Sequence, residues 1–284
     1  MYDSHAHLEI LAQRLGMIED IKDNDFGKLD IEQKQQIKEK VKGVGEFIVN
    51  HDFLIQPSVS TENFKLVYYL FNQLTNVSFL AGSHPEIVTK EFEVEGYLND
   101  QKKVLEEYSG KFVGIGECGL DYYYTQDHEI ITKQKELFRS QIELAVELDL
   151  PLIIHCRDAF EDLFEILRSY PSIWGKFLIH CFTGSVDEVK EILQMKGYFG
   201  IGGVCTFKSA SYLREAISQI PVENIFMETD LPFLSPTPYR GEVCMPQYIG
   251  FSADVVAKIK NIPTLELWEQ TQKKAKEFFN LSID

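Results

Sequence analysis

The chain begins with Met1-Tyr2-Asp3-Ser4-His5-Ala6-His7-Leu8, a short strand-like segment that leads directly into two histidines. We expect residues 1–7 to form a β-strand. In an open doubly wound sheet the first strand usually leads into a glycine-rich phosphate loop, and this chain has His5-Ala6-His7 at that place. The segment therefore favours a barrel over an open sheet, which remains the structural alternative.

Seven further apolar segments alternate with longer amphipathic ones. Such alternation predicts α/β architecture with a parallel sheet, and eight strands are the number that closes a (β/α)8 barrel of the TIM type. The expected strands are residues 1–7, 53–59, 77–83, 112–117, 152–155, 177–181, 198–202 and 225–228. Expected helices include residues 61–74, 133–148, 160–170, 209–220 and 264–280, the last with Thr264 as its cap.

Residues 9–49 do not fit the simplest strand–helix repeat. Residues 31–42 (IEQKQQIKEKVK) have a charged helical pattern, and residues 23–30 resemble a polar loop. We interpret this stretch as an enlarged first loop and helix at the rim of the barrel. Because no internal repeat, low-complexity tract or linker is visible, we expect residues 1–284 to form a single domain.

The chain is acidic, with 28 basic and 44 acidic residues and a formal charge of −16. This balance argues against a basic groove that coats long nucleic acid. It does not exclude a nucleic-acid substrate, because bound divalent cations invert the local charge of a site. Without a signal sequence or an apolar stretch of about 20 residues, no membrane contact is expected. We expect a cytoplasmic protein, or a nuclear one if its source is eukaryotic, that is a monomer or a weak oligomer.

The ends of the expected strands carry one kind of chemistry. Barrel enzymes place their reactive groups at the carboxyl ends of the strands, where the side chains converge. One histidine at such a place is at least as often a rim residue as a ligand, but this pattern recurs on separate strands. Imidazole and carboxylate together suit zinc, manganese and similar divalent ions. The residues at the strand ends are His5, His7, His84, Glu117, His155, His180 and Asp230.

Three of the five cysteines, Cys118, Cys156 and Cys181, each follow one of these residues directly. Neighbouring side chains on a strand point to opposite faces. We therefore expect these cysteines to pack as small apolar groups away from the histidines, which makes thiolate ligation the weaker interpretation.

Cationic side chains in the loops after the strands are candidates for binding a substrate phosphate. These are Arg157, Lys208 and Arg240, although an ion pair within the loop or a plain surface position is an equally good interpretation for each. The run Tyr122-Tyr123-Tyr124 follows Glu117, and loop tyrosines either stack on bases or, more commonly, pack between loop and helix.

Taken in order, these segments resemble the TatD family of metal-dependent deoxyribonucleases, which have an amidohydrolase-like barrel. The resemblance covers residues 3 to about 280, and the ordered set is much more specific than any single motif. It is carried by Asp3-Ser4-His5-Ala6-His7-Leu8, Gly82-Ser83-His84-Pro85, Gly114-Ile115-Gly116-Glu117-Cys118-Gly119-Leu120-Asp121-Tyr122-Tyr123, Ile154-His155-Cys156-Arg157-Asp158-Ala159, His180-Cys181-Phe182-Thr183-Gly184 and Glu228-Thr229-Asp230-Leu231-Pro232.

The resemblance implies two divalent metal ions, either Mg²⁺, Mn²⁺ or Zn²⁺. His5, His7, Glu117 and Asp230 would hold one of them, and Glu117, His155 and His180 the other. His84 matches a family histidine near the scissile phosphate, and Asp230 would also act as the base. The implied reaction is 3′→5′ exonucleolytic hydrolysis of DNA, at ends or in single strands.

Two features depart from the family pattern. Residues 9–49 exceed the usual first connection, and Cys244-Met245-Pro246 stands where the family usually has Asn-Glu-Pro. The missing glutamate puts any supporting role at Met245 in doubt. The alternative function is a small-molecule or aminoacyl-ester or amide hydrolase on the same barrel, which the acidic charge keeps open.

Overall fold

The computed structural model describes residues 1–20 and 26–282, and the described residues contain eight short parallel strands. Each strand overlaps one of the expected segments. The strands are β1 (Tyr2–Asp3), β2 (Phe53–Gln56), β3 (Val77–Phe79), β4 (Ile115–Asp121), β5 (Leu152–Arg157), β6 (Phe177–Ile179), β7 (Tyr198–Ile201) and β8 (Ile225–Met227).

The strands follow one another in space in the same order as in the sequence. Continuous pairing forms two sheets, β1-β2-β3 and β4-β5-β6-β7-β8, and every pair is parallel. Isolated bridges span the two junctions, Leu80 to Gly114 between β3 and β4 and Ala6 to Leu231 beyond β8 and β1. The α/β class is thereby confirmed, and the order and the two bridges fit a (β/α)8 barrel.

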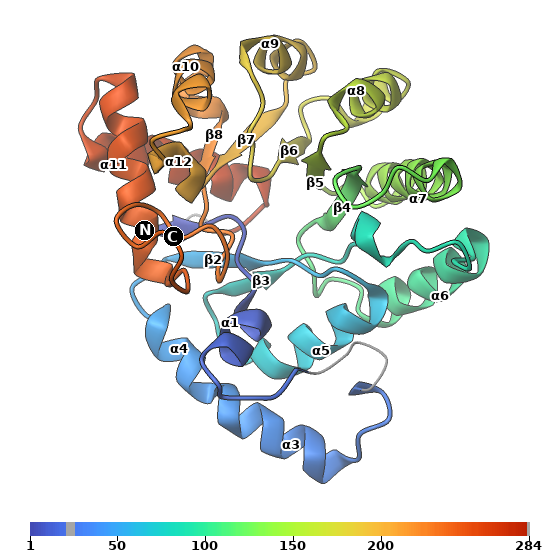
Figure 1. The fold of residues 1–284 in the computed structure, drawn as a ribbon. Helices are drawn as coiled ribbons and strands as arrows, with labels where there is room; N and C mark the ends of the chain where they lie inside the picture. Colours follow the sequence, from blue (N-terminus) through green and yellow to red (C-terminus); the bar gives the residue numbers. More distant parts are fainter. Residues whose placement is uncertain (21–25, 283–284) are drawn as a thin grey trace.

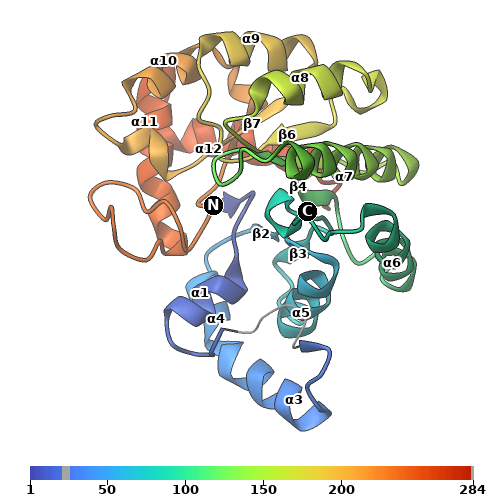
Figure 2. The same ribbon diagram turned by 45° about the vertical axis from the view of Figure 1, so that its right-hand side comes forward.

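Helices follow the strands and lie around them, as Figures 1 and 2 show from two directions. None of the described helices is long and apolar enough to cross a membrane. The helices after β2 are α5 (Thr61–Phe71), α6 (Val94–Glu107), α7 (His128–Glu147), α8 (Phe160–Arg168), α9 (Val186–Gln194), α10 (Ser211–Gln219), α11 (Ile249–Lys260) and α12 (Thr264–Phe278).

The first connection is long and contains several helices: α1 (Leu8–Arg14), α3 (Ile31–Lys40) and α4 (Val44–Phe47). Helix α3 buries none of its residues, and Figure 1 shows it outside α1, α4 and α5. Its charged sequence and the Asp30 capping box are sufficient to explain an exposed helix. Residues 23–25 of the predicted polar loop lie outside the described residues.

Several predicted boundaries were wrong by a few residues. Strand β4 continues to Asp121 and β5 to Arg157, because these two residues pair with each other beyond the expected ends. Helix α7 begins at His128, five residues before the predicted start, with Asp127 as its cap. Thr264 is the first residue of α12 rather than its cap, and its hydroxyl donates to Asp254.

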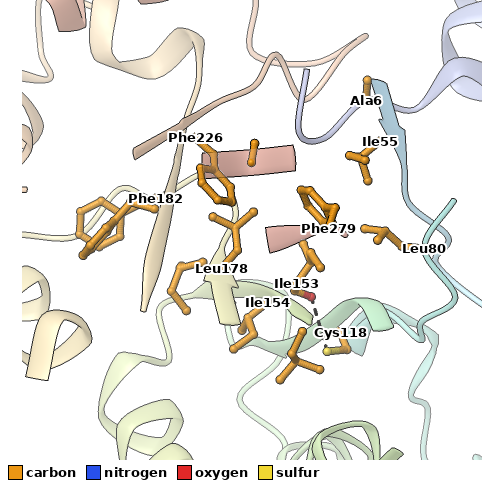
Figure 3. Close-up of a cluster of buried hydrophobic side chains, with 14 of the residues drawn as sticks. Ala6, Ile55, Leu80, Cys118, Ile153, Ile154, Leu178, Phe182, Phe226 and Phe279 are labelled. Carbon is orange, nitrogen blue, oxygen red and sulfur yellow. Dashed lines mark hydrogen bonds between the residues drawn. The ribbon is translucent and has the colours of Figure 1, made fainter. Parts of the chain in front are cut away.

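Apolar side chains from the strands and helices form a continuous buried cluster. Figure 3 shows Cys118 within this cluster, close to Ile153, whose carbonyl oxygen accepts a hydrogen bond from the thiol. Cys156 packs against the edge of the cluster. Cys118 and Cys156 therefore pack as the strand alternation predicts, while the histidine or glutamate before each belongs to a polar group of side chains.

Candidate metal centre

The predicted ligands come together at the carboxyl ends of the strands. Since parallel strands in a barrel point the same way, residues at their ends meet although more than 200 positions separate them in sequence. His5 and His7 follow β1, Glu117 lies within β4, His155 lies within β5, His180 follows β6 and Asp230 follows β8.

The Glu117 carboxylate lies at the middle of this group. Its Oε2 is 3.3 Å from His5 Nε2 and 3.6 Å from His7 Nε2. Its Oε1 is 2.7 Å from His180 Nε2 and 3.1 Å from His155 Nδ1. The two carboxylate oxygens thus face different sets of imidazole nitrogens, as the oxygens of a carboxylate shared between two cations would.

Asp230 lies on the side of His5 and His7. Its Oδ1 is 3.8 Å from His5 Nε2 and 3.7 Å from His7 Nε2, and those two nitrogens are 3.2 Å apart. Asp230 has a φ of 59°, a left-handed conformation that is uncommon for aspartate. The turn after β8 therefore holds this carboxylate toward the first pair of histidines rather than continuing the strand.

Asp121 fixes the tautomer of His155. The Asp121 Oδ2 lies 2.8 Å from His155 Nε2, and a carboxylate in that position accepts a proton from the ring. With its proton on Nε2, the ring has its lone pair on Nδ1, the atom that faces Glu117. Asp121 is itself held by the Tyr123 N–H, which donates to Oδ1, and Gln134 accepts from the Asp121 N–H.

His84 has the opposite orientation. Its Nδ1 accepts a hydrogen bond from the Glu86 backbone N–H, so the neutral ring carries its proton on Nε2. That Nε2 lies 3.4 Å from Glu117 Oε1 and points into the centre. A ring with this tautomer is suited to donate a hydrogen bond and poorly suited to bind a cation through Nε2.

The pKa values of the first two histidines suit cation binding. Burial lowers the pKa of His5 to about 4 and that of His7 to about 3, so both rings are neutral at pH 7 and offer a lone pair. Burial also raises the pKa of Glu117, but the imidazoles of His180, His84 and His5 outweigh burial and hold that pKa well below its usual range.

Burial, together with the nearby Glu117, raises the pKa of Asp230 well above its usual range. The metal-free protein therefore retains a proton on Asp230 to a higher pH than a free aspartate does, and a bound cation would favour its release.

A buried aspartate connects the ends of β1 and β8. Asp3 accepts hydrogen bonds from the backbone N–H groups of His5 and Thr229 and from the Thr229 hydroxyl, the last at 2.6 Å. The Thr229 hydroxyl oxygen in turn accepts from the Leu231 N–H. These bonds hold the segments that carry His5 and Asp230 against each other.

Glu9 lies behind His7, with its Oε1 3.9 Å from His7 Nδ1. Two amide side chains hold this buried carboxylate, because Gln56 donates to Oε2 and Asn63 donates to Oε1. Gln56 also accepts from the Leu8 N–H at the start of α1. Strand β2 and helix α5, which carry Gln56 and Asn63, thus support the histidine pair that follows β1.

Glu228 is a fully buried carboxyl group on the side of His180. Its Oε1 accepts a hydrogen bond from the Cys181 backbone N–H and lies 3.9 Å from His180 Nδ1. Burial, and after it the nearby Asp230, raises the pKa of Glu228 well above its usual range.

Sequence reasoning gave no role to Asp121, Glu228 or Glu9. A signal existed for Asp121, which follows Glu117 by four residues and lies on the same face of an extended strand. The same period of two relates Glu228 to Asp230. No such signal existed for Glu9, because the chain enters α1 at Leu8 and strand alternation ends there.

The predicted substrate-binding residues lie in the loops, as expected. Arg157 forms no ion pair with Asp158 within the described chain; instead its guanidinium lies 3.5 Å from the centre of the Tyr123 ring. Tyr123 and Tyr124 are 56% and 70% exposed. Tyr122 behaves as the commoner interpretation predicted, since its hydroxyl donates to Asp162 of α8.

Arg240 lies over the Phe207 ring, with its guanidinium carbon 4.3 Å from the ring centre. Lys208 is exposed beside Phe207, and no ion pair involves it in the described part of the chain. The phosphate-binding role of Arg157, Lys208 and Arg240 stays a prediction.

The donor set fits divalent cations. Three overlapping groups of side chains have ligand atoms within 4.8 Å of one another: His5, His7 and Glu117; His5, His180 and Asp230; and His84, Glu117 and His155. Imidazole nitrogens and carboxylate oxygens are the ligands of catalytic zinc, manganese and related ions. No cysteine of the described residues joins these groups. A barrel with this centre at its strand ends defines a metal-dependent hydrolase.

Comparison with known families agrees with this class. The family model described as TatD related DNase matches residues 2–280. The chain belongs to this family, which confirms the resemblance seen in the sequence motifs.

Two proteins of similar sequence are also described as metal-dependent hydrolases. YabD of Bacillus subtilis, described as an uncharacterized metal-dependent hydrolase, is 41% identical over 172 residues, which are 61% of this chain and 67% of YabD. The metal-dependent hydrolase BU355 of Buchnera aphidicola is 30% identical over 99% of both chains.

Solved structures share the fold. YjjV, a TatD homologue from Escherichia coli, has a TM-score of 0.78 and 23% identity and covers 99% of this chain and 98% of its own. A TatD family protein from Entamoeba histolytica has a TM-score of 0.75 and 23% identity, with 98% and 97% coverage.

Proposed function

We propose that this chain is a deoxyribonuclease that uses two divalent metal ions to hydrolyse phosphodiester bonds, removing nucleotides from the 3′ ends of DNA. The main support is the Glu117 carboxylate, which places one oxygen toward His5 and His7 and the other toward His180 and His155. A carboxylate shared between two sets of imidazoles is best explained by two cations that lie side by side.

In this proposal His5, His7, Glu117 and Asp230 hold one ion, and Glu117, His155 and His180 hold the other. When bound, such ions supply a water of lowered pKa and neutralise the charge that develops on the phosphate. Magnesium, manganese and zinc are the candidate ions. We further propose that residues 1–284 form a single domain, which the continuous buried cluster from Tyr2 to Phe279 supports.

The remaining roles belong to side chains of the chain itself. Asp230 accepts the proton of the attacking water at Oδ1. His84 carries a proton on Nε2 and donates a hydrogen bond to an oxygen of the scissile phosphate. Arg157, Lys208 and Arg240 bind phosphates of the strand as cations on the loops around the centre.

A second candidate function is the hydrolysis of a small ester or amide, and the acidic chain favours it. A formal charge of −16 repels a polyanion at long range and leaves a small neutral substrate unaffected. Imidazole and carboxylate groups that hold divalent ions serve the hydrolysis of either kind of bond, so a comparison of substrates separates the two candidates.

The test is a comparison of substrates on one enzyme preparation. Single-stranded DNA labelled at either end would be incubated beside a panel of aminoacyl esters, simple esters and amides, with Mg²⁺, Mn²⁺ or Zn²⁺. We expect the 5′-labelled strand to shorten progressively and the 3′-labelled strand to release labelled mononucleotide at once. Turnover of the small substrates alone, lost in Glu117→Ala, would contradict the nuclease proposal and support the second candidate.

A further inference from the structure

A cavity of about 490 Å³ lies beside the candidate centre, formed mainly by the loop that follows Asp230. Phe233, on its wall, also contacts the centre: its ring lies edge-on to that of His7, with 6.1 Å between ring centres. Phe233 therefore lies between the cavity and the side of the centre that carries His7. Its volume falls within the range of small-ligand sites and is sufficient for a mononucleotide.

One side of the cavity wall is apolar and aromatic, and another side carries cationic side chains. Phe207, Phe233 and Leu234 contribute the apolar part, and Phe233 is 38% exposed. The cations are Arg14, from the end of α1, and Arg240. Neither arginine forms a salt bridge with any described carboxylate, including Glu242, which also lines the cavity.

A buried polar group adds a further feature. Ser235 lines the cavity and is 3% exposed, and its hydroxyl has no hydrogen-bond partner of normal geometry among the described residues, although the Cys244 thiol is close enough to affect it. A buried hydroxyl without a partner is destabilising. The oxygen atom itself is closed to solvent and lies beside the Cys244 thiol, so it belongs to the fixed wall of the cavity and not to its ligand-binding surface.

The loop that forms the cavity is held in place before any ligand binds. The Leu234 carbonyl packs so closely on Gly203 that a Cβ there would lie 2.0 Å from it. The Thr237 N–H donates to the Thr206 hydroxyl, and the Cys244 N–H donates to the Pro232 carbonyl. Such fixed walls favour a specific ligand over adaptable contact.

We propose that this cavity binds one deoxynucleotide unit of the substrate, with its base against Phe233 and Leu234 and a phosphate toward Arg14 and Arg240. A purely apolar ligand would leave two unpaired arginines beside it, and a bare phosphate would leave the aromatic wall in water. A nucleoside phosphate matches both parts. The inference rests on the proposed nuclease function, and it assigns a role to α1, the first helix of the enlarged connection.

The test measures the contribution of the base separately from that of the phosphate. Calorimetric titration of the metal-loaded full chain would compare thymidine 5′-monophosphate, deoxyribose 5-phosphate and inorganic phosphate. We expect the nucleotide to bind about tenfold more tightly than deoxyribose 5-phosphate, because base–aromatic stacking is worth about that much. Phe233→Ala should remove most of this ratio, and Arg14→Gln should weaken both sugar phosphates several-fold.

Matched controls are available on distant elements. Tyr212→Ala removes a half-exposed aromatic ring from α10, and Arg168→Gln removes a surface arginine from α8; both should bind all three ligands as the unchanged protein does. Equal affinity for the nucleotide and deoxyribose 5-phosphate, or an unchanged ratio in folded Phe233→Ala, would overturn the cavity proposal even if the enzyme degrades DNA. If the ratio behaves as expected and DNA remains intact, the nuclease proposal fails and the cavity proposal stands.

Discussion

At the scale of single residues, the candidate centre depends on which nitrogen of each histidine carries the proton. His155 and His84 present different atoms to Glu117 because their other nitrogens contact different partners, the Asp121 carboxylate and the Glu86 N–H. In the neutral form of each ring, the first offers a lone pair on Nδ1 and the second offers a proton on Nε2. These partners therefore separate a candidate ligand from a candidate hydrogen-bond donor within one group of histidines.

Asp121→Ala should weaken binding of the second cation by about 10- to 100-fold, because His155 loses the partner that fixes its tautomer and its orientation. Asp121→Asn should have a smaller effect, since the amide oxygen still accepts from Nε2. Competition with a coloured chelator measures both affinities. The control is Asp149→Ala, an exposed aspartate that pairs with Lys176 on the surface. Unchanged affinity in folded Asp121→Ala would contradict the role given to Asp121.

At the scale of elements, the strands bring distant segments together through a few polar contacts at their ends. Asp3 and Thr229 connect β1 to β8, and Gln56 of β2 supports the start of α1. Such contacts explain how strands of only two or three residues hold ligand candidates in fixed positions. They also indicate where a change outside the candidate ligands should weaken the fold.

Thr229→Val should lower the free energy of unfolding of the metal-free protein by about 1–3 kcal/mol, because Asp3 loses a donor and the Leu231 N–H loses its acceptor. Thr229→Ser retains the hydroxyl and should remain within about 1 kcal/mol of the unchanged protein. Urea denaturation measures both. Equal stability of the valine and serine variants would show that these hydrogen bonds do not support the junction.

The sequence was sufficient to predict the position of every strand because each has an apolar segment of suitable length. It was not sufficient to predict where β4 and β5 end. The residues after Glu117 mix apolar and polar types, and it is the pairing of Asp121 with Arg157 on the neighbouring strand that extends both. Register between strands is a tertiary property, which local pattern does not contain.

At the scale of the whole molecule, the buried titratable groups couple the stability of the metal-free protein to pH. Burial alone would lower the pKa of His155, but the hydrogen bonds that its ring donates to the Asp121 and Glu117 carboxylates outweigh burial and raise that pKa to about 9. The pKa values of Asp230 and Glu228 are raised as well, and burial is the largest cause for both groups. The folded metal-free chain therefore holds protons that the unfolded chain releases.

The free energy of unfolding of the metal-free protein should fall as the pH rises from about 6.5 to 9. For His155 the stabilising contribution is complete below the unfolded pKa near 6.5 and disappears as the pH passes through about 9, at up to about 1.4 kcal/mol per pH unit. Asp230 and Glu228 act with the same sign. Denaturation at several pH values measures the slope, which should be shallower in Asp121→Asn. A slope of the opposite sign would contradict the pKa directions.

The cavity shows what sequence reasoning misses at this scale. Arg14 and the loop after Asp230 are more than 200 residues apart, and only the closure of the ring between β8 and β1 makes them neighbours. The candidate ligands were predictable because the same kinds of residue recur at successive strand ends. The cavity residues share no such pattern: they come from the end of α1, from the loop at Phe207 and from the loop after Asp230.

The central claim is that Glu117 joins two cation sites, and counting bound metal tests it most directly. Protein loaded with Mn²⁺ and freed of excess ion would be analysed by inductively coupled plasma mass spectrometry, beside Glu117→Gln and the surface control Glu129→Gln. We predict two ions per chain in the unchanged protein and the control, and at most one, weakly held, in Glu117→Gln. Two ions retained in Glu117→Gln, or fewer than two in the unchanged protein at saturation, would contradict the claim.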